Sequence, residues 1–415
     1  MQVRPLRQEE MERYASIIKD AFVLPGDFKE TWLSTTKPED TRGLFDEQGH
    51  LIAGMRLLWN ELWLGQRPVK PAGVTSVATP PEFRRKGHLK QLLTTVMTEL
   101  RESGINITTL YPFEFAFYRK FGYELASATA EINVKIPAMA HFKSKAHGEW
   151  EQVGPNDWPE LNSLYQQYSV GRFGRLERPT EFWWMRQLLT PRIDGNKKEM
   201  TIYRWRDEKG RVRAYVIYYM KILQNQWDRE MSIREMVWLD EDARYEIYSF
   251  IANHDSQASA ATWETEPGDE FFALMQDPRS AKISTHPGYM LRLLDVERAL
   301  GERAWPALEQ GQGGSFSLAV RDNVLHWNHD RTYRMEVRPG SETESQVEIT
   351  AIAGSAHAGL SCDVRTLAQM YAGYLSPKQA ARLRLLEVHN SHELDLAQRI
   401  FSPPGQPGAF MNDFW

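Results

Sequence analysis

The stretch 74–93, VTSVATPPEFRRKGHLKQLL, constrains the fold most, because its hydrophobic pattern changes period in the middle. Small and β-branched residues run from Val74 to Thr79 and stop at two consecutive prolines, as a buried strand does before a turn. Beyond the turn, apolar residues recur at the spacing of one helix face: Leu89, Leu92, Leu93 and Met97. The stretch therefore predicts a strand, a tight turn and a helix.

The turn in this stretch places cations in front of the predicted helix. Arg84, Arg85 and Lys86 precede Gly87 there. The first N–H groups of a helix have no partner inside it, and the helix dipole favours an anion at that end, so the site suits a pyrophosphate. Neither the G-x-x-x-x-G-K-S/T loop nor the G-x-G-x-x-G fingerprint occurs here. The alternative is a basic first helical turn on a solvated surface.

A second motif follows the predicted helix. Residues 112–123 read PFEFAFYRKFGY, and Phe117-Tyr118-x-x-Phe121-Gly122-Tyr123 is similar to the F-Y-x-x-x-G-F/Y segment after the fifth strand of the GCN5-related N-acetyltransferases (GNAT). Residues 84–89, RRKGHL, resemble the R-x-x-G-x-G/A loop of that superfamily, with Leu89 in place of the small last residue. The motifs occur in the right order and about 30 residues apart, as one helix and one strand require.

The GNAT resemblance implies a role for each motif. The loop holds the pyrophosphate of acetyl-CoA through the residues of the turn and helix start: Arg84, Arg85, Lys86, Gly87, His88 and Leu89. The central strand offers main-chain groups to the pantetheine arm at Val77, Ala78 and Thr79. Tyr118 donates a proton to the departing sulfur, since a phenol with a pKa of about 10 matches a thiol with a pKa of about 8.5 closely enough. The alternative for Tyr118 is an aromatic ring packed between helix and sheet.

The length of the chain predicts several domains, because 415 residues are too many for one core and a domain takes about 150. Residues 1–145 form an α/β pattern around the two motifs. Residues 146–290 repeat the same order of strands and helices, so we interpret them as a second copy of the fold. At 238–244, WLDEDAR, this copy has three acids and no glycine where a pyrophosphate would lie. Acids there repel a phosphate, so the second copy lacks the CoA loop and is structural.

Residues 291–415 differ in pattern from both copies. Short strands are predicted at 314–320, 324–327, 332–337 and 347–351, and helices near 365–374 and 377–386. This α+β unit begins with LRLLDV and resembles the sterol-carrier-like domain of the enhanced intracellular survival (Eis) N-acetyltransferases, a family that tolerates leucine at the Leu89 position. The resemblance covers the whole chain. It implies an α/β and α+β multidomain protein, with tandem acyl-CoA N-acyltransferase (GNAT) folds followed by a sterol-carrier-protein-like domain, and it makes residues 1–145 the active domain.

The end of the chain is unusually apolar, since Phe410, Met411, Phe414 and Trp415 follow a Pro/Gly-rich tether. The Eis resemblance implies that this tail reaches the active site and that the Trp415 α-carboxylate is the general base. An α-carboxyl has a pKa near 3.5 and an alkylammonium near 10, so direct proton transfer is uphill by about 9 kcal/mol. Burial that shifts both pKa values, or a water chain, relieves this mismatch. The alternative is a tail that only packs its aromatic rings on its own domain.

The resemblance implies acetyl-CoA-dependent transfer of acetyl directly to primary amines of a polycationic substrate, aminoglycoside-like or a lysine or polyamine. No acyl-enzyme is predicted, because Cys362 lies far from both motifs and no G-x-S-x-G elbow occurs. Candidate substrate-binding residues are Asp27, Trp32, Phe113 and Asp413. The alternative for each is an ordinary surface or packing residue. Two other interpretations stay open: a non-enzymatic lipid or acyl-CoA binding protein, and an acyltransferase for a longer acyl chain.

Composition excludes several other classes. A net charge of -5 argues against a nucleic-acid binder, and a single cysteine excludes an intrachain disulfide or a cysteine-rich zinc site. No H-E-x-x-H motif occurs, so no metal is implied. The charged N-terminus and the absence of a long apolar run predict a cytoplasmic protein without a membrane span. The Eis resemblance implies a homo-oligomer, specifically a hexamer.

Overall fold

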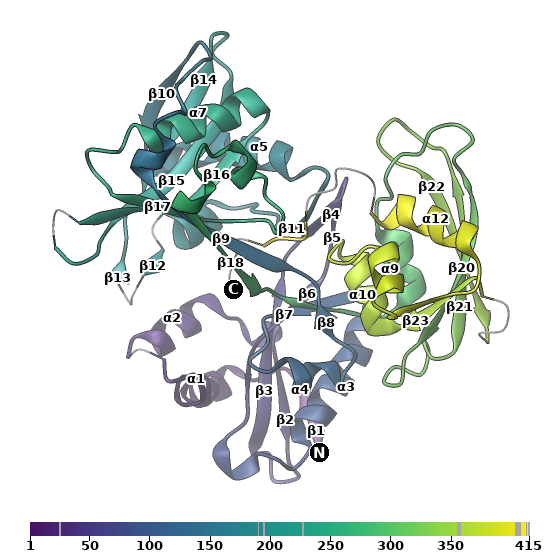
Figure 1. The fold of residues 1–415 in the computed structure, drawn as a ribbon. Helices are drawn as coiled ribbons and strands as arrows, with labels where there is room; N and C mark the ends of the chain where they lie inside the picture. Colours follow the sequence, from purple (N-terminus) through teal and green to yellow (C-terminus); the bar gives the residue numbers. More distant parts are fainter. Residues whose placement is uncertain are drawn as a thin grey trace.

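The structure, a computed structural model, describes residues 1–415 except 25, 190, 194–195, 226–227, 355–357, 403–407, 412 and 414–415. Three units meet near the centre of the molecule (Figure 1). We call them the N-terminal unit, built around the first seven-stranded sheet, the middle unit, built around the second seven-stranded sheet, and the C-terminal unit, built around a five-stranded sheet.

The N-terminal unit has the sheet order β1-β2-β3-β6-β7-β19-β8. Its helix α3 (His88–Glu102) buries one face through residues at helical spacing: Leu92, Leu93, Val96, Met97 and Leu100. The remaining elements of this unit are β1 (Gln2–Arg4), α1 (Gln8–Phe22), α2 (Phe28–Thr35), β2 (Thr41–Phe45), β3 (Leu51–Trp59), β6 (Ala72–Ala78), β7 (Ile107–Leu110), α4 (Phe115–Arg119) and β8 (Glu124–Leu125). The strand, turn and helix predicted from 74–93 are thus β6, the turn and α3.

The middle unit repeats this layout with the sheet order β10-β14-β15-β16-β17-β9-β18. Its elements are β10 (Gly148–Val153), α5 (Trp158–Ser169), β14 (Thr201–Asp207), β15 (Val212–Ile222), β16 (Arg229–Trp238), α7 (Glu241–Ala252), β17 (Ala260–Thr265), α8 (Phe271–Leu274) and β18 (Ala281–Pro287). The helix α7 follows the central strand β16, as α3 follows β6. The predicted second copy of the fold is therefore present.

The two seven-stranded sheets exchange a strand. β9 (Ala128–Lys135) follows the N-terminal unit in the chain but lies between β17 and β18, where Ile132 pairs with Trp263 and Ile283. In return, β19 (Met290–Leu293) lies between β7 and β8 of the N-terminal sheet. A border drawn along the sequence therefore does not separate the two sheets, and neither sheet is complete without the other unit's segment of chain.

A smaller sheet also joins these two units. β11 (Arg172–Leu176) pairs with β4 (Leu62–Gly65), which in turn pairs with β5 (Pro68–Val69). The Gly171 N–H donates to the Gly65 carbonyl at 2.9 Å and continues this contact beyond the strand. The segment 171–178 of the middle unit is thereby fixed against the N-terminal unit.

The C-terminal unit has the sheet order β22-β21-β20-β23-β24. Its elements are α9 (Val296–Glu302), β20 (Gly314–Arg321), β21 (Arg331–Arg338), β22 (Gln346–Ala353), β23 (Leu360–Asp363), α10 (Val364–Tyr371), α11 (Pro377–Arg382), β24 (Leu386–Val388) and α12 (Ser391–Phe401). The predicted strand at 324–327 is wrong: these residues form a turn, because Asp322 Oδ1 accepts hydrogen bonds from the N–H groups of Val324 and Leu325.

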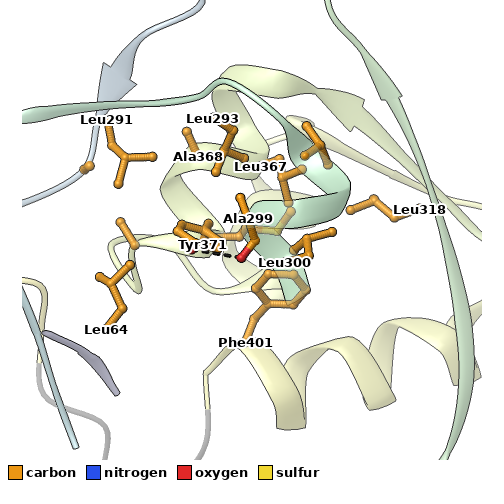
Figure 2. Close-up of a cluster of buried hydrophobic side chains, with 14 of the residues drawn as sticks. Leu64, Leu291, Leu293, Ala299, Leu300, Leu318, Leu367, Ala368, Tyr371 and Phe401 are labelled. Atoms are coloured by element: carbon orange, nitrogen blue, oxygen red, sulfur yellow. Dashed lines mark hydrogen bonds between the residues drawn. The ribbon is translucent and has the colours of Figure 1, made fainter. Parts of the chain in front are cut away.

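The core of the C-terminal unit is continuous with the units before it. Figure 2 shows Leu64 of β4 and Leu291 and Leu293 of β19 facing the side chains of α9 and α10. The Tyr371 hydroxyl at the centre of this cluster donates to the Ala299 carbonyl at 3.0 Å. Cys362 is only 1% exposed in the same cluster. The C-terminal unit is thus packed onto the N-terminal sheet rather than tethered to it.

Candidate active site

The central strands of the N-terminal sheet diverge. β6 and β7 pair in parallel at Ala72↔Thr108 and Gly73↔Thr109, and no later pair joins them within the described residues. β6 nevertheless runs on to Ala78, paired on its other edge with β3. The edge of β6 that faces β7 therefore offers unpaired main-chain groups over 74–78, which suit an extended ligand with amides of its own.

A bulge in β6 lies at this wedge. Ser76 has a φ of 53°, and the register with β3 shifts between Gly54 and Arg56. The Tyr14 hydroxyl of α1 donates to the Ser76 carbonyl. A Cβ on Gly54 would lie 2.5 Å from the Tyr14 ring, so only glycine leaves room for that ring. Tyr14, a buried residue of α1, thus fixes the bulge, and nothing in its local sequence indicates a bond to β6.

The turn between β6 and α3 has the shape of an anion site. Gly87, the residue before α3, has a φ of 82°, and Arg85 has a φ of 61°. A Cβ on Gly87 would meet nothing within 4 Å, so glycine is needed there for its backbone conformation alone. The Arg84 Nε donates to the Thr79 carbonyl at 3.0 Å, which closes the turn on the end of β6.

The surroundings of this turn fit a pyrophosphate. Arg85 and Lys86 are exposed, while His88 and Leu89 are half-buried at the start of the helix. The Gln91 N–H donates to the carbonyl of Gly87, the residue before α3, at 3.3 Å. The N–H groups before Gln91 are therefore left for an anion, at the positive end of a 15-residue helix.

Tyr118 lies on α4, close to the wedge. Its side chain is 2% exposed, and its ring makes edge contacts with Phe113 (5.4 Å), Phe117 (5.1 Å) and Tyr123 (5.9 Å). No described residue forms a hydrogen bond with its hydroxyl. Burial, and to a smaller extent Tyr123, raises the pKa of Tyr118 well above the usual value of a phenol. The hydroxyl therefore keeps its proton at neutral pH and is a donor.

The two tyrosines beside Tyr118 are also held protonated. Burial raises the pKa of Tyr123 to about 12, although a hydrogen bond from Thr108 Oγ1 (2.7 Å) and the charge of Arg292 oppose the shift. Burial raises the pKa of Tyr14 well above its usual value, and Tyr118 adds to this. Tyr118 packs in the cluster that includes Val74 of β6 and Leu110 of β7, whereas Tyr14 packs in the cluster that includes Ala78 at the end of β6.

The predicted substrate residues lie at different distances from this centre. Trp32 is 4% exposed and packs edge-on against Tyr14 with ring centroids 5.7 Å apart, whereas Phe113 is 62% exposed beside Tyr118. Asp27 is exposed at the N-terminus of α2. The structure thus places Trp32 and Phe113 against the two tyrosines that flank the wedge. Trp415, predicted as the general base, lies outside the described residues.

The described part of the C-terminal tail binds between the N-terminal and middle units. The Ala128 N–H donates to the Ala409 carbonyl at 3.2 Å, and the Phe410 N–H donates to the Phe173 carbonyl at 3.0 Å. Asp413 is buried and forms an ion pair with Arg178 at 2.9 Å. The Tyr111 hydroxyl, just after β7, donates to the Asp413 carbonyl at 3.4 Å. Asp413 is therefore fixed next to the end of a wedge-forming strand, and its Oδ2 has no hydrogen-bond partner among the described residues.

The middle unit has a different helix start in the corresponding place. Asp240 precedes α7, and its carboxylate accepts a hydrogen bond from the Ala243 N–H at 2.8 Å and pairs with Arg213. Burial opposes a lower pKa of Asp240, but these contacts outweigh it and lower the pKa. With Glu241 and Asp242 following, the site is already occupied by negative charge of the chain's own.

Two general properties follow from the described residues. None of their helices combines the length and apolar composition that crossing a bilayer requires. They also contain no group of three or more His, Cys, Asp or Glu arranged to hold a metal ion.

Known proteins share this architecture along the whole chain. Residues 2–126 and 174–293 each match an acetyltransferase (GNAT) domain family, and residues 296–409 match a sterol carrier protein domain family. An uncharacterized N-acetyltransferase of Streptomyces avermitilis is 23% identical over 98% of this chain and 97% of its own. The N-acetyltransferase Eis of Mycobacterium tuberculosis is 25% identical over 66% of this chain and 70% of its own.

Solved structures agree with this assignment. A GCN5-related N-acetyltransferase from Anabaena variabilis has a TM-score of 0.83 and 26% identity, and the match covers 100% of both chains. Eis1 from Mycobacterium abscessus has a TM-score of 0.78 and 21% identity, again over 100% of both chains. The likeness therefore extends over the two acetyltransferase folds and the sterol carrier fold together.

Proposed function

From the premise that this chain is an N-acetyltransferase of the Eis type, with two GNAT domains followed by a sterol carrier domain, we propose that it acetylates primary amines of a polycationic substrate. The substrate class is an aminoglycoside-like molecule, a polyamine or a lysine side chain. The single observation that carries the proposal is that β6 and β7 stop pairing after Gly73, in the unit that also contains the glycine turn before α3 and the buried Tyr118.

Acetyl-CoA supplies the acetyl group as an activated thioester. The main chain at Val77, Ala78 and Thr79 is assigned to the pantetheine arm, because this edge of β6 lacks strand partners among the described residues. Arg85, Lys86 and the N–H groups of His88 and Leu89 are assigned to the pyrophosphate. Arg84 is bonded to the Thr79 carbonyl and shapes the turn, so its contribution is partly to positioning.

Tyr118 is assigned as the general acid that protonates the leaving sulfur. Its raised pKa makes the hydroxyl a weaker acid than a free phenol, but it also keeps the proton available at neutral pH. The same dry surroundings raise the pKa of a departing thiol, since burial disfavours a thiolate as it does a phenolate. The pKa values of the donor phenol and the acceptor thiol are thus both raised.

The terminal carboxylate of Trp415 is assigned as the group that accepts the amine proton. The supporting observation is that Asp413, two positions before Trp415, is buried and in hydrogen-bond contact with Tyr111. A carboxylate with a pKa near 3.5 takes a proton from an ammonium with a pKa near 10 only at a cost of about 9 kcal/mol, so burial of both groups or a water chain is part of the proposal.

The cationic substrate is assigned to Asp27, Trp32, Phe113 and Asp413. Of these, Asp413 would contact it through Oδ2, because Oδ1 is bound by Arg178. The cytoplasmic location and the homohexamer belong to the same proposal and rest on the family resemblance. The limits 1–145, 146–290 and 291–415 are likewise the proposed domains. The sheets cross these limits, because β9 of the first domain joins the second sheet and β19, at the limit between the second and third domains, joins the first sheet.

The test is release of CoA thiol from acetyl-CoA with a panel of aminoglycosides, polyamines and lysine peptides. We expect turnover by the native chain, and we expect its loss in chains that lack Trp415 or carry a C-terminal extension, with acetyl-CoA binding retained. Binding without turnover for every amine would contradict the proposal and favour an acyl-CoA or lipid binding protein. Preference for a long acyl-CoA over acetyl-CoA would instead identify a different acyltransferase.

A further inference from the structure

The central strands of the middle unit diverge as those of the N-terminal unit do. β16 and β17 pair in parallel from Glu230↔Ala260 to Ile233↔Trp263. Beyond this, β16 runs on to Trp238 and β17 to Thr265, with no further pair among the described residues. In the N-terminal unit the corresponding edge of β6 is assigned to acetyl-CoA under the proposed function. In the middle unit the chain's own C-terminal segment lies at the ends of these strands.

Two glycines mark the path of this segment. A Cβ on Gly408 would lie 2.9 Å from the carbonyl oxygen of Pro267, just after β17. Gly174 has a φ of 91°, and a Cβ there would lie 2.7 Å from the carbonyl oxygen of Phe410. The tail backbone can therefore lie this close to Pro267 and to Gly174 because neither Gly408 nor Gly174 carries a side chain.

The segment 173–178 supplies most of the contacts to the tail. Phe173 accepts the Phe410 N–H, and the Arg175 guanidinium lies 4.6 Å from the centre of the Phe410 ring. Phe410 is 2% exposed as a result. This segment overlaps β11, which pairs with β4 of the N-terminal unit. The surface that receives the tail is thus fixed to both acetyltransferase folds.

Arg178 forms the polar anchor at the end of this surface. Its side chain is fully buried, with the guanidinium 3.6 Å from the centre of the Tyr165 ring. Two nitrogens bind both oxygens of Glu235, at 2.7 and 2.6 Å, and Nη2 also binds Asp413 Oδ1 at 2.9 Å. The Tyr215 hydroxyl donates to Glu235 at 2.6 Å and completes the partners of that carboxylate. A fork of this kind holds a carboxylate in one orientation.

We infer that the middle unit is a receptor for the chain's own C-terminal segment, and that Arg178, held by Glu235, is a positioning residue that binds the Asp413 carboxylate and so places the two residues that follow it. The middle unit then contributes to the reaction without binding a CoA. The docking half of this inference stands alone; the catalytic half rests on the proposed function, in which the terminal carboxylate accepts a proton.

Asp413→Asn in the full-length chain tests the docking half. The substitution keeps the shape of the side chain and leaves the Arg178–Glu235 pair intact, so the fold is preserved. The inference expects carboxypeptidase A to remove the aromatic C-terminal residues faster from a released tail than from a docked one, and mass spectrometry measures the loss of Trp415 and Phe414. The amide oxygen can still accept a hydrogen bond from Arg178 but carries no charge, so we expect release to be about tenfold faster or more than in the native chain, the range for weakening a charge-assisted hydrogen bond.

Asp395→Asn is the matched control, because Asp395 pairs with Lys378 on the exposed surface of the same C-terminal unit. It should leave the release rate at the native value. Arg178→Lys keeps the charge but removes the fork, and it should give an intermediate rate, with the double variant Arg178→Lys/Asp413→Asn no faster than the faster single one. A release rate for Asp413→Asn equal to that of Asp395→Asn would overturn the receptor.

Steady-state kinetics test the catalytic half. Asp413→Asn should lower kcat about tenfold, while KM for acetyl-CoA stays the same because the wedge in the N-terminal unit is untouched. Faster tail release with an unchanged kcat would overturn the positioning role. If no amine is acetylated by the native chain, the proposed function fails, and the carboxypeptidase experiment still decides whether the middle unit holds the tail.

Discussion

In both the N-terminal and the middle unit, the two central strands stop pairing partway along their length. The two units differ in the residues at the start of the helix that follows. In the N-terminal unit, β6 leaves β7 after Gly73, and the next helix starts from Gly87 with its first N–H groups available. In the middle unit, β16 leaves β17 after Ile233, and the next helix starts from Asp240, whose carboxylate already caps it. The first arrangement admits a phosphate, whereas the second excludes one.

Under the proposed function, a few residues at the helix start separate a unit that binds acetyl-CoA from a unit that supports it. A carboxylate cap stabilises its helix by about 1 kcal/mol, but it uses the same N–H groups that a pyrophosphate would bind. A glycine in the left-handed region gives up that stability and leaves the groups free. Stability and ligand binding are thus alternatives at the same position of the two units.

The largest expected effect that separates the two units is at the proton donor. Tyr118→Phe should lower kcat by about a hundredfold to ten-thousandfold, the usual contribution of a general acid, with little change in KM for acetyl-CoA. Tyr123→Phe is the control, since its hydroxyl is occupied by a hydrogen bond from Thr108. Equal losses of kcat in the two variants would remove the special role of Tyr118.

The pH dependence of kcat should reflect the same residue. A group with a raised pKa keeps its proton to higher pH, so kcat should not decline through the range where a free phenol, with a pKa of about 10, ionises. The decline in native kcat is expected above that range and should be absent in Tyr118→Phe. A fall in native kcat centred well below pH 10, and removed by Tyr118→Phe, would mean that the hydroxyl is less buried than described.

A smaller effect is expected at the turn before α3. In Gly87→Ala, a φ of 82° strains the backbone by about 1 kcal/mol, so the turn adopts another conformation. Binding of the cosubstrate must then restore the original conformation. KM for acetyl-CoA should rise about fivefold, with kcat nearly unchanged. Gly210→Ala is the matched control, because Gly210 has a φ of 72° in a hairpin turn of the middle unit and its Cβ would also meet nothing. If both variants change KM equally, the turn is not the anion site.

The smallest effect should come from the helix cap of the middle unit. Asp240→Ala should lower the free energy of unfolding at pH 7 by about 1 kcal/mol, as measured by urea denaturation, and should leave KM for acetyl-CoA unchanged. The folded-state pKa of Asp240 is lowered, so its contribution is present above the unfolded pKa of about 3.9 and is lost as pH falls through the folded value. A changed KM would show that the middle unit does interact with the cosubstrate.

Local sequence patterns predicted the elements whose form depends on neighbouring residues. Of the predicted helix face, Leu92, Leu93 and Met97 are buried on α3, and Gly87 directly precedes the helix. The strand predicted at 324–327 failed because Asp322 captures two main-chain N–H groups and makes a turn instead. The apolar residues Val324 and Leu325 carried no sign of that competition.

Long-range contacts could not be predicted in the same way. Arg178 and Asp413 are 235 residues apart, and each alone is an ordinary charged residue. The exchange of β9 and β19 depends on which of two similar sheets each strand joins, and alternation in either strand fits both. The hydrogen bond from the Tyr14 hydroxyl to the Ser76 carbonyl likewise links a helix to a bulge that no local sequence pattern predicts.

The difference between the two units is tested most directly by the stoichiometry of acetyl-CoA binding to the full-length chain, measured by titration calorimetry. We expect one molecule per chain, with an affinity that falls about tenfold or more in Arg85→Ala/Lys86→Ala, since each lost charged contact costs about 1 kcal/mol or more. Two molecules per chain, or one whose affinity the double substitution leaves unchanged, would contradict the assignment of the wedge in the N-terminal unit as the acetyl-CoA site.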